Sequence, residues 1–111
     1  MPRFVAAVAL AVALAAPAAA AEPERLRAGA TVADWRAGGW DVRYETAHHY
    51  LVSVADDAWL DAHGTDSLWP SAFHLAECVQ VTVAPASAVA SGAPVHDLFV
   101  PCLRRLDAAA R

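Results

Sequence analysis

The sequence contains no lysine and has only two cysteines, one methionine and five glycines among its 111 residues. All eight basic residues are arginine, and beside the abundant alanine this indicates the codon bias of a GC-rich genome rather than a function. Twelve acidic residues give a formal net charge of −4. Because nucleic acids and anionic lipids require a basic surface, we expect this protein to bind neither.

Motifs that would indicate catalysis or a cofactor are also missing. The chain has no C-x-x-C for thiol exchange, no C-x-x-C-H for haem and no G-x-S-x-G for a nucleophilic serine. Neither H-x-H nor H-x-x-x-H occurs, and the acidic residues do not follow the order of a calcium-binding loop. We therefore expect no cofactor and no catalytic activity, and a minimal hydrolase ranks last among the alternatives.

The N-terminus has the pattern of an export signal. Residues 4–16 are an apolar run, Pro17 interrupts it, and the alanines at 19–21 satisfy the small-x-small rule for cleavage before Glu22. The alternative is an uncleaved membrane anchor, because residues 4–21 approach the ~18 apolar residues that span a bilayer. We expect cleavage, no membrane span afterwards, and a periplasmic or secreted bacterial protein. The predicted organisation is a signal peptide over 1–21, a flexible leader over 22–30 and a single small domain over 31–111.

Two cysteines, Cys78 and Cys102, follow the predicted cleavage site. An exported chain with an even number of cysteines is expected to oxidise them, so the sequence predicts one disulfide. Removing the signal leaves 111 − 21 = 90 residues, a small domain with a limited core. For a closed loop of about 25 residues, the chain-entropy model gives roughly 3.5 kcal/mol of stabilisation.

Residues 31–64 carry signals for two short helices and a hairpin. Thr31 and Asp34 match a capping box, Trp35 is the expected inward anchor, and Gly38-Gly39 is the expected stop. Alternation of apolar and polar residues over 40–45 and 50–54 predicts an antiparallel hairpin, with His48 or His49 in its turn. A second short helix is expected to begin at Asp56 or Asp57 and to end at Gly64.

The C-terminal part leaves two interpretations open. Alternating valines predict a strand over 78–83, and the first interpretation adds a strand over 95–100 followed by a helix from Pro101. In the second, Asp97 caps one continuous helix that places Leu98, Cys102, Leu106 and Ala109 on one face. We prefer the first, because a proline beyond the first helical turn removes a backbone hydrogen bond. The predicted fold is α+β: a small antiparallel sheet of three to four strands, a short N-terminal helix, a C-terminal helix and one disulfide.

Aromatic residues suggest a binding surface. Most should be core, but Trp59 and Trp69 fall in the least regular segment and are the candidates for contacting a partner protein, a peptide or a glycan of the cell envelope. The expected function is thus a small exported, non-catalytic binding or accessory module. The alternative is a periplasmic metal-binding protein, for which the candidate ligands are His48, His49, Asp57, Asp61 and His63.

Overall fold

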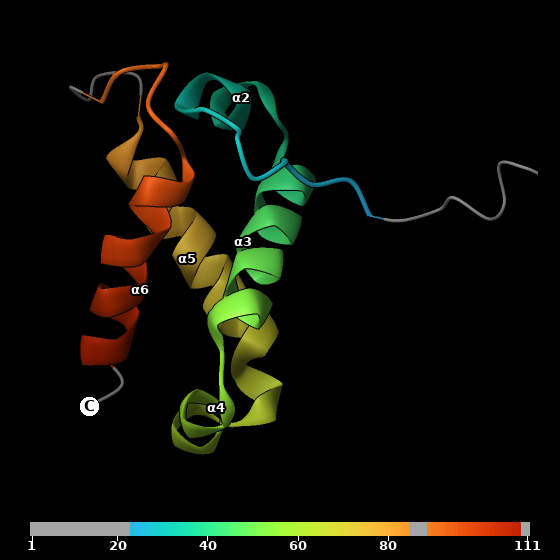
Figure 1. Ribbon diagram of the computed structural model, residues 1–111, viewed down its shortest axis with the longest axis vertical. Coiled ribbons are helices and arrows are strands. Elements are labelled where there is room, and N and C mark those ends of the chain that lie inside the picture. The colour runs from blue at the N-terminus through green and yellow to red at the C-terminus, as the bar shows by residue number, and fades with distance from the viewer. Residues whose placement is uncertain (1–22, 85–88, 110–111) are drawn as a thin grey trace, which may run out of the picture.

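The computed structural model describes residues 23–84 and 89–109, so the predicted signal peptide lies outside the described residues. Within those two ranges the chain is all-α, with five helices, one 3-10 turn and no strand (Figure 1). None of these helices is long and apolar enough to cross a membrane. The elements are α2 (Val32–Ala37), α3 (Trp40–Val54), α4 (Asp57–His63), η2 (Thr65–Ser67), α5 (Leu68–Thr82) and α6 (His96–Ala109).

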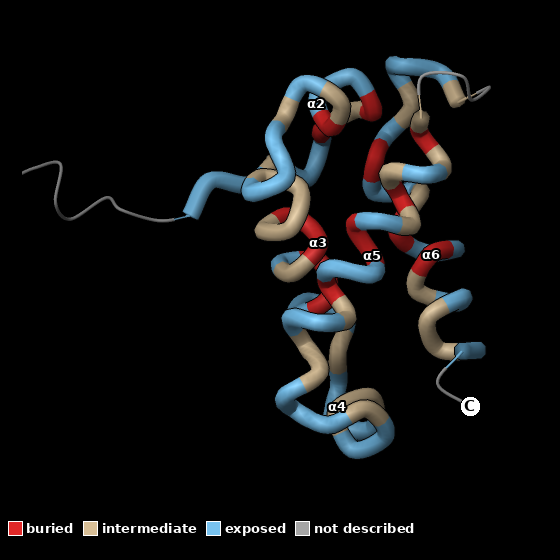
Figure 2. The backbone as a smooth tube through the Cα atoms, turned by 180° about the vertical axis from the view of Figure 1, so that it is seen from behind, coloured by how far each residue is buried: buried red, intermediate tan, exposed pale blue. Residues whose placement is uncertain are grey.

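Helix α5 lies between α3 and α6 and is antiparallel to both, while α2 and α4 close opposite ends of the bundle (Figure 1). The buried stretches of the three long helices face one another (Figure 2). The predicted α+β fold is therefore wrong. The architecture is a three-helix bundle whose central helix contacts both others.

The segment predicted as a strand over 78–83 is the last part of α5. Val79 and Val83 are fully buried, whereas Val81 between them is 77% exposed. A strand would place all three on one face, whereas a helix places Val79 and Val83 on one face and turns Val81 away from it. Leu75 and Ala76, one turn earlier, extend the same buried stripe. Burial at a spacing of three to four residues explains why a helix replaces the predicted strand.

The predicted hairpin over 40–54 is likewise one continuous helix, α3. Its buried residues include Ala47, Tyr50 and Leu51, which lie three to four positions apart and face α5 and α6. In a strand these side chains would point to both faces. The alternation over 40–45 was misleading because Trp40 is 42% exposed and lies at the surface.

The preferred interpretation of the C-terminal part is also wrong, because α6 begins at His96 and contains Pro101 in its interior. Phe99 and Cys102 are buried three positions apart, and Leu98 and Leu106 pack beside them. Burial of this amphipathic face compensates for the hydrogen bond that Pro101 cannot donate. The alternative of a single helix is therefore the closer one.

Both short helices are confirmed. Thr31 and Asp34 form the predicted capping box, and α2 ends before Gly38. The Asp56 side chain caps α4 by accepting from the Trp59 amide, and Gly64, with φ of 86°, ends it. In both cases the deciding signal is local, because a side chain within three residues satisfies a free amide of the first turn.

Two long-range links hold the bundle together. The predicted disulfide joins Cys78 on α5 to Cys102 on α6, with Cα atoms 5.8 Å apart. It links two helices, whereas the sequence predicts a strand at Cys78, and it is consistent with an oxidising compartment. The segment 23–30, predicted as the leader, has no regular secondary structure, and its Leu26 amide donates to Thr46 Oγ1 on α3 at 2.9 Å.

Candidate functional site

An exposed row of aromatic side chains runs along the seam between α3 and α5. Trp40, Trp69 and Phe73 are each about two fifths exposed, at 42%, 39% and 40%. Tyr44 and His48 lie between them and are half-buried. We call these five rings, Trp40, Tyr44, His48, Trp69 and Phe73, the aromatic face. Isolated exposed aromatics are ordinary, but a contiguous set is typical of an interaction surface.

Each ring of the aromatic face contacts the next. Trp40 stacks on Tyr44 with centroids 5.2 Å apart, and Tyr44 meets Phe73 edge-on at 4.7 Å. Phe73 lies 5.8 Å from Trp69, and His48 stacks on Trp69 at 3.8 Å with an interplanar angle of 5°. The rings come from positions four apart on each helix, so the antiparallel pairing of α3 with α5 is what assembles them. The result is a continuous platform held by contacts between rings.

Carboxylates border this platform on both helices. Asp41 and Glu45 each follow a ring of the aromatic face on α3, and Glu77 lies one turn beyond Phe73 on α5. None of the three makes an ion pair with another described residue. One basic group is close, because the Arg43 guanidinium lies 5.0 Å from the Trp40 ring centroid. That group is already engaged, donating to the carbonyls of Trp35 and Arg36.

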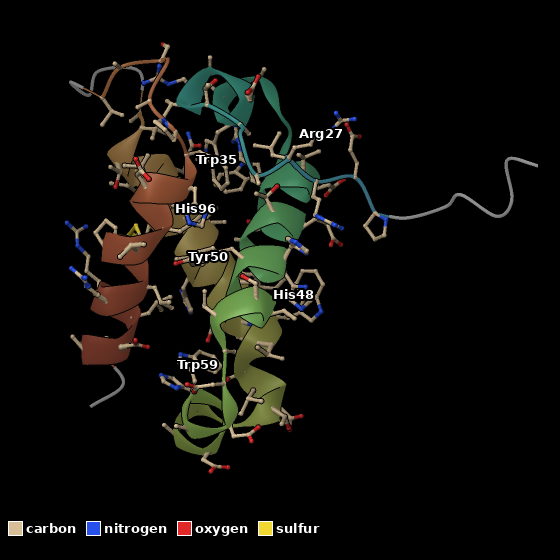
Figure 3. The ribbon with its side chains drawn as sticks, in the orientation of Figure 1. Arg27, Trp35, His48, Tyr50, Trp59 and His96 are labelled. Carbon is tan, nitrogen blue, oxygen red and sulfur yellow. A yellow bond between two sulfur atoms is a disulfide. The ribbon has the colours of Figure 1, made fainter. Side chains whose placement is uncertain are left out.

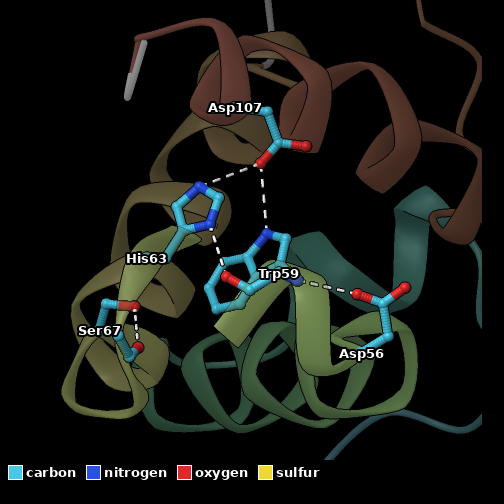
Figure 4. Close-up of polar contacts among 6 residues, drawn as sticks. Asp56, Trp59, His63, Ser67 and Asp107 are labelled. Carbon is cyan, nitrogen blue, oxygen red and sulfur yellow. Dashed lines mark hydrogen bonds and ion pairs between the residues drawn. The ribbon is translucent and has the colours of Figure 1, made fainter. Parts of the chain in front are cut away.

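Trp59, the other tryptophan predicted to contact a partner, is half-buried in a different environment. Its ring stacks on His63 at 4.1 Å, and its Nε1 donates to Asp107 Oδ1 at 3.3 Å (Figure 4). His63 Nδ1 lies 2.9 Å from the Trp59 carbonyl, so it must carry the proton, because a carbonyl only accepts. His63 Nε2 then faces Asp107 Oδ1 at 3.4 Å. This cluster ties α4 to α6.

The candidate metal ligands are not brought together. His48 is part of the aromatic face, whereas His49 lines a pocket on another side of α3. Asp57 and Asp61 are exposed on α4, and His63 contacts Trp59 and Asp107. In the part of the chain that the structure describes, no group of three or more His, Cys, Asp or Glu side chains is placed to hold a metal ion.

A pocket of about 590 Å³ lies between residues 23–28, α3 and the start of α6. We call it the α3–α6 pocket. Tyr50 and His96 meet there edge-on at 5.2 Å, on the other side of α3 from His48 (Figure 3). Tyr50 also stacks on Phe99 at 4.7 Å. Burial raises the pKa of the Tyr50 phenol, because desolvation disfavours the phenolate.

Of the rings in the aromatic face, the sequence names Trp69 as a candidate partner contact and His48 as a candidate metal ligand, and it predicts His48 or His49 in a hairpin turn. It wrongly predicts that Trp40 and Tyr44 lie in a strand, because both are on helix α3. The missed signal was the repeat of aromatic residues every four positions, over 40, 44 and 48 and again over 69 and 73. The α3–α6 pocket had no such signal, because its walls come from segments far apart in the sequence.

Comparison with known proteins adds no further evidence on the site. No protein-family model, no curated protein and no solved structure matches this chain.

Proposed function

We propose that this chain is a bacterial exported, non-catalytic binding module, periplasmic or secreted, and that its aromatic face docks a basic, apolar segment of a partner protein of the cell envelope. The observation that carries the proposal is the exposed ring platform on α3 and α5. Three of its rings keep about two fifths of their surface exposed. Tryptophan and tyrosine are enriched among the residues that dominate the energy of protein interfaces.

The rigidity of the platform supports a docking role. Rings that stack on one another lose little freedom when a partner covers them, so binding costs less conformational entropy. The aromatic face also lies on two helices that pack together through the core, rather than on a loop. Apolar side chains of a partner would cover the rings, and a polar rim would surround the contact, as is usual in interfaces.

Charge favours a basic partner. Asp41, Glu45 and Glu77 border the rings without ion pairs among the described residues, so they are available to arginine or lysine of another chain. Cations also bind favourably over tryptophan and tyrosine faces, with about 0.5–2 kcal/mol per contact. Acidic borders and exposed rings thus favour the same kind of occupant, a segment that combines basic and apolar side chains.

Export is supported by two independent features. The predicted signal over 1–21 directs the chain out of the cytoplasm. The disulfide between Cys78 and Cys102 is of the kind that persists in oxidising compartments. Together they favour partners in the envelope or outside the cell.

A peptide titration tests the proposal. The probe is a short peptide rich in arginine, leucine and phenylalanine, and its counterpart replaces each arginine with glutamate. We expect saturable binding of the basic peptide and at least about tenfold weaker binding of the acidic one, because like charges at the border repel it. Two results would contradict the proposed partner: binding of a neutral oligosaccharide instead of the basic peptide, or concentration-dependent dimerisation through the same rings.

Two variants make the test specific. Trp69→Ala removes the ring at one end of the platform, and Val81→Ala removes an apolar side chain that is 77% exposed elsewhere on α5. We expect Trp69→Ala to weaken binding about thirtyfold, an effect typical of losing a tryptophan that anchors an interface, and Val81→Ala to leave it unchanged. Equal losses in both variants would refute a site at the aromatic face.

A further inference from the structure

We propose that the α3–α6 pocket binds a small organic anion with a flat apolar body, such as an aromatic carboxylate. Its volume of about 590 Å³ is suitable for such a molecule, since small-molecule sites span about 300–1,000 Å³. The pocket uses Thr46, His49, Tyr50 and Ser53 of α3. These residues lie on a different face of the helix from the aromatic face, so this proposal does not depend on the proposed function.

The inner wall of the pocket is apolar and partly aromatic. Val95, Phe99 and Tyr50 are nearly buried, at 3%, 2% and 9% exposure, and each also lines the pocket. The Tyr50 and Phe99 rings are stacked with an interplanar angle of 17°. Two near-parallel rings offer a flat surface beside the cavity, which favours a ligand that is itself flat and apolar.

The outer wall is basic. Arg25 and Arg27 both line the pocket, and neither guanidinium makes an ion pair or a hydrogen bond with the residues that the structure describes. Two other arginines, Arg36 and Arg43, are not available in this way, because they donate hydrogen bonds to backbone carbonyls at 2.9 and 3.0 Å. Among the described residues that line the pocket, Glu24 is the one carboxylate.

Further polar groups complete the site. The Tyr50 hydroxyl donates to no partner among the described residues, and its raised pKa keeps the proton on the phenol. His49 and His96 also line the pocket, and both are exposed. His96 is the first residue of α6, so the positive end of that helix adds to the charge of the two arginines. Basic groups at the rim and rings at the wall together select an anion with an apolar body.

The experiment titrates the exported protein with 2-naphthoate and follows its amide signals by NMR. The matched probes are 2-naphthamide, which keeps the rings without the charge, and inorganic phosphate, which keeps charge without the rings. We expect saturable shifts from 2-naphthoate at residues 24–28, 49–53 and 95–99, and binding at least about tenfold weaker for either other probe. Added salt should weaken the naphthoate complex, because the arginines are exposed.

Variants assign the interaction to the pocket. The double variant Arg25→Gln and Arg27→Gln should weaken naphthoate binding about tenfold or more, whereas Arg104→Gln with Arg105→Gln, at exposed positions on α6, should not. Tyr50→Phe keeps the ring and should weaken binding several-fold through loss of the hydroxyl alone. Equal binding of 2-naphthamide, equal loss in both arginine pairs, shifts centred on other helices, or no saturable binding would each overturn the proposal.

Discussion

His48 on α3 lies flat against Trp69 on α5, with ring centroids 3.8 Å apart and planes 5° from parallel. This contact fixes one end of the aromatic face and joins the two helices at the surface. Because Trp69 remains 39% exposed, its outer side is available to a partner while its inner side is held. The stack therefore explains how a ring stays ordered at the surface without being part of the core.

Replacing Trp69 should weaken partner binding and leave the protein folded. We expect Trp69→Ala to lower the free energy of unfolding by about 1 kcal/mol, because the side chain is only partly buried. His48→Ala should cost no more, since it removes the other half of the same stack. Urea unfolding of both variants checks this, and a loss above about 3 kcal/mol would show that Trp69 belongs to the core.

Trp35 should be far more sensitive. It is fully buried, its Nε1 donates to Gln80 Oε1 at 3.0 Å, and it meets Phe99 edge-on. We expect Trp35→Ala to cost about 3–5 kcal/mol and Gln80→Leu about 1 kcal/mol, through loss of the hydrogen bond alone. Trp40→Ala, at an exposed position, is the control and should cost less than about 1 kcal/mol. A similar loss of unfolding free energy in Trp35→Ala and Trp40→Ala would contradict the burial of Trp35 in the core.

The disulfide should contribute a large part of the stability. Cys78 and Cys102 are 24 positions apart, and the chain-entropy model gives roughly 3.5 kcal/mol for such a loop. Urea unfolding of the native protein and of a Cys78→Ala, Cys102→Ala variant measures this contribution. Added reductant should shift the native protein toward the variant and leave the variant unchanged. A native midpoint that does not move when the thiols are reduced would contradict the prediction.

A substitution at Pro101 tests whether the C-terminal helix begins at His96, as observed, or at Pro101, as the sequence predicts. Inside α6 it lacks the amide that would donate to Asp97, so Pro101→Ala should restore that bond and stabilise the protein by about 1–2 kcal/mol. If a helix began at Pro101 instead, the proline would be favourable there and alanine would destabilise. The sign of the change in urea midpoint therefore reports where the helix begins.

The buried phenol of Tyr50 should make the stability of the protein depend on pH in the alkaline range. Burial raises the pKa of its phenol, so the unfolded chain loses this proton at lower pH than the folded protein does. The contribution to stability is constant below the ordinary tyrosine pKa of about 10 and is lost as pH rises toward the folded value. The free energy of unfolding should fall less steeply above about pH 10 in Tyr50→Phe than in the native protein. Identical slopes would refute the effect of burial.

Local signals were sufficient to predict part of this fold. The capping box at Thr31, the cap at Asp56 and the stop at Gly64 depend on contacts within a few residues, and all three are present. The disulfide followed from the number of cysteines and the export signal. Trp35 was also predicted correctly as an inward anchor, because a large ring in a short capped helix must find burial elsewhere.

The long helices were predicted wrongly where short alternation competed with a spacing of four. Val79 and Val83 fit both periods, and the 77% exposure of Val81 between these two buried residues identifies the helix. The aromatic face was missed because Phe73 and Trp69 meet Tyr44 and His48 only through the pairing of α3 with α5, which the predicted strands do not provide. The α3–α6 pocket was beyond sequence reasoning, because it needs residues 23–28 placed against α3 and α6.

The rings of α3 and α5 are the proposed docking surface of this protein. Its most direct test is to map the amide shifts caused by the basic, apolar peptide. We expect saturable shifts to concentrate at residues 40–48 and 69–77, and we expect Trp69→Ala to raise the peptide concentration needed for them about thirtyfold while Val81→Ala leaves it unchanged. Shifts centred on α6 or on residues 23–28, or the same shifts from the acidic peptide, would contradict it.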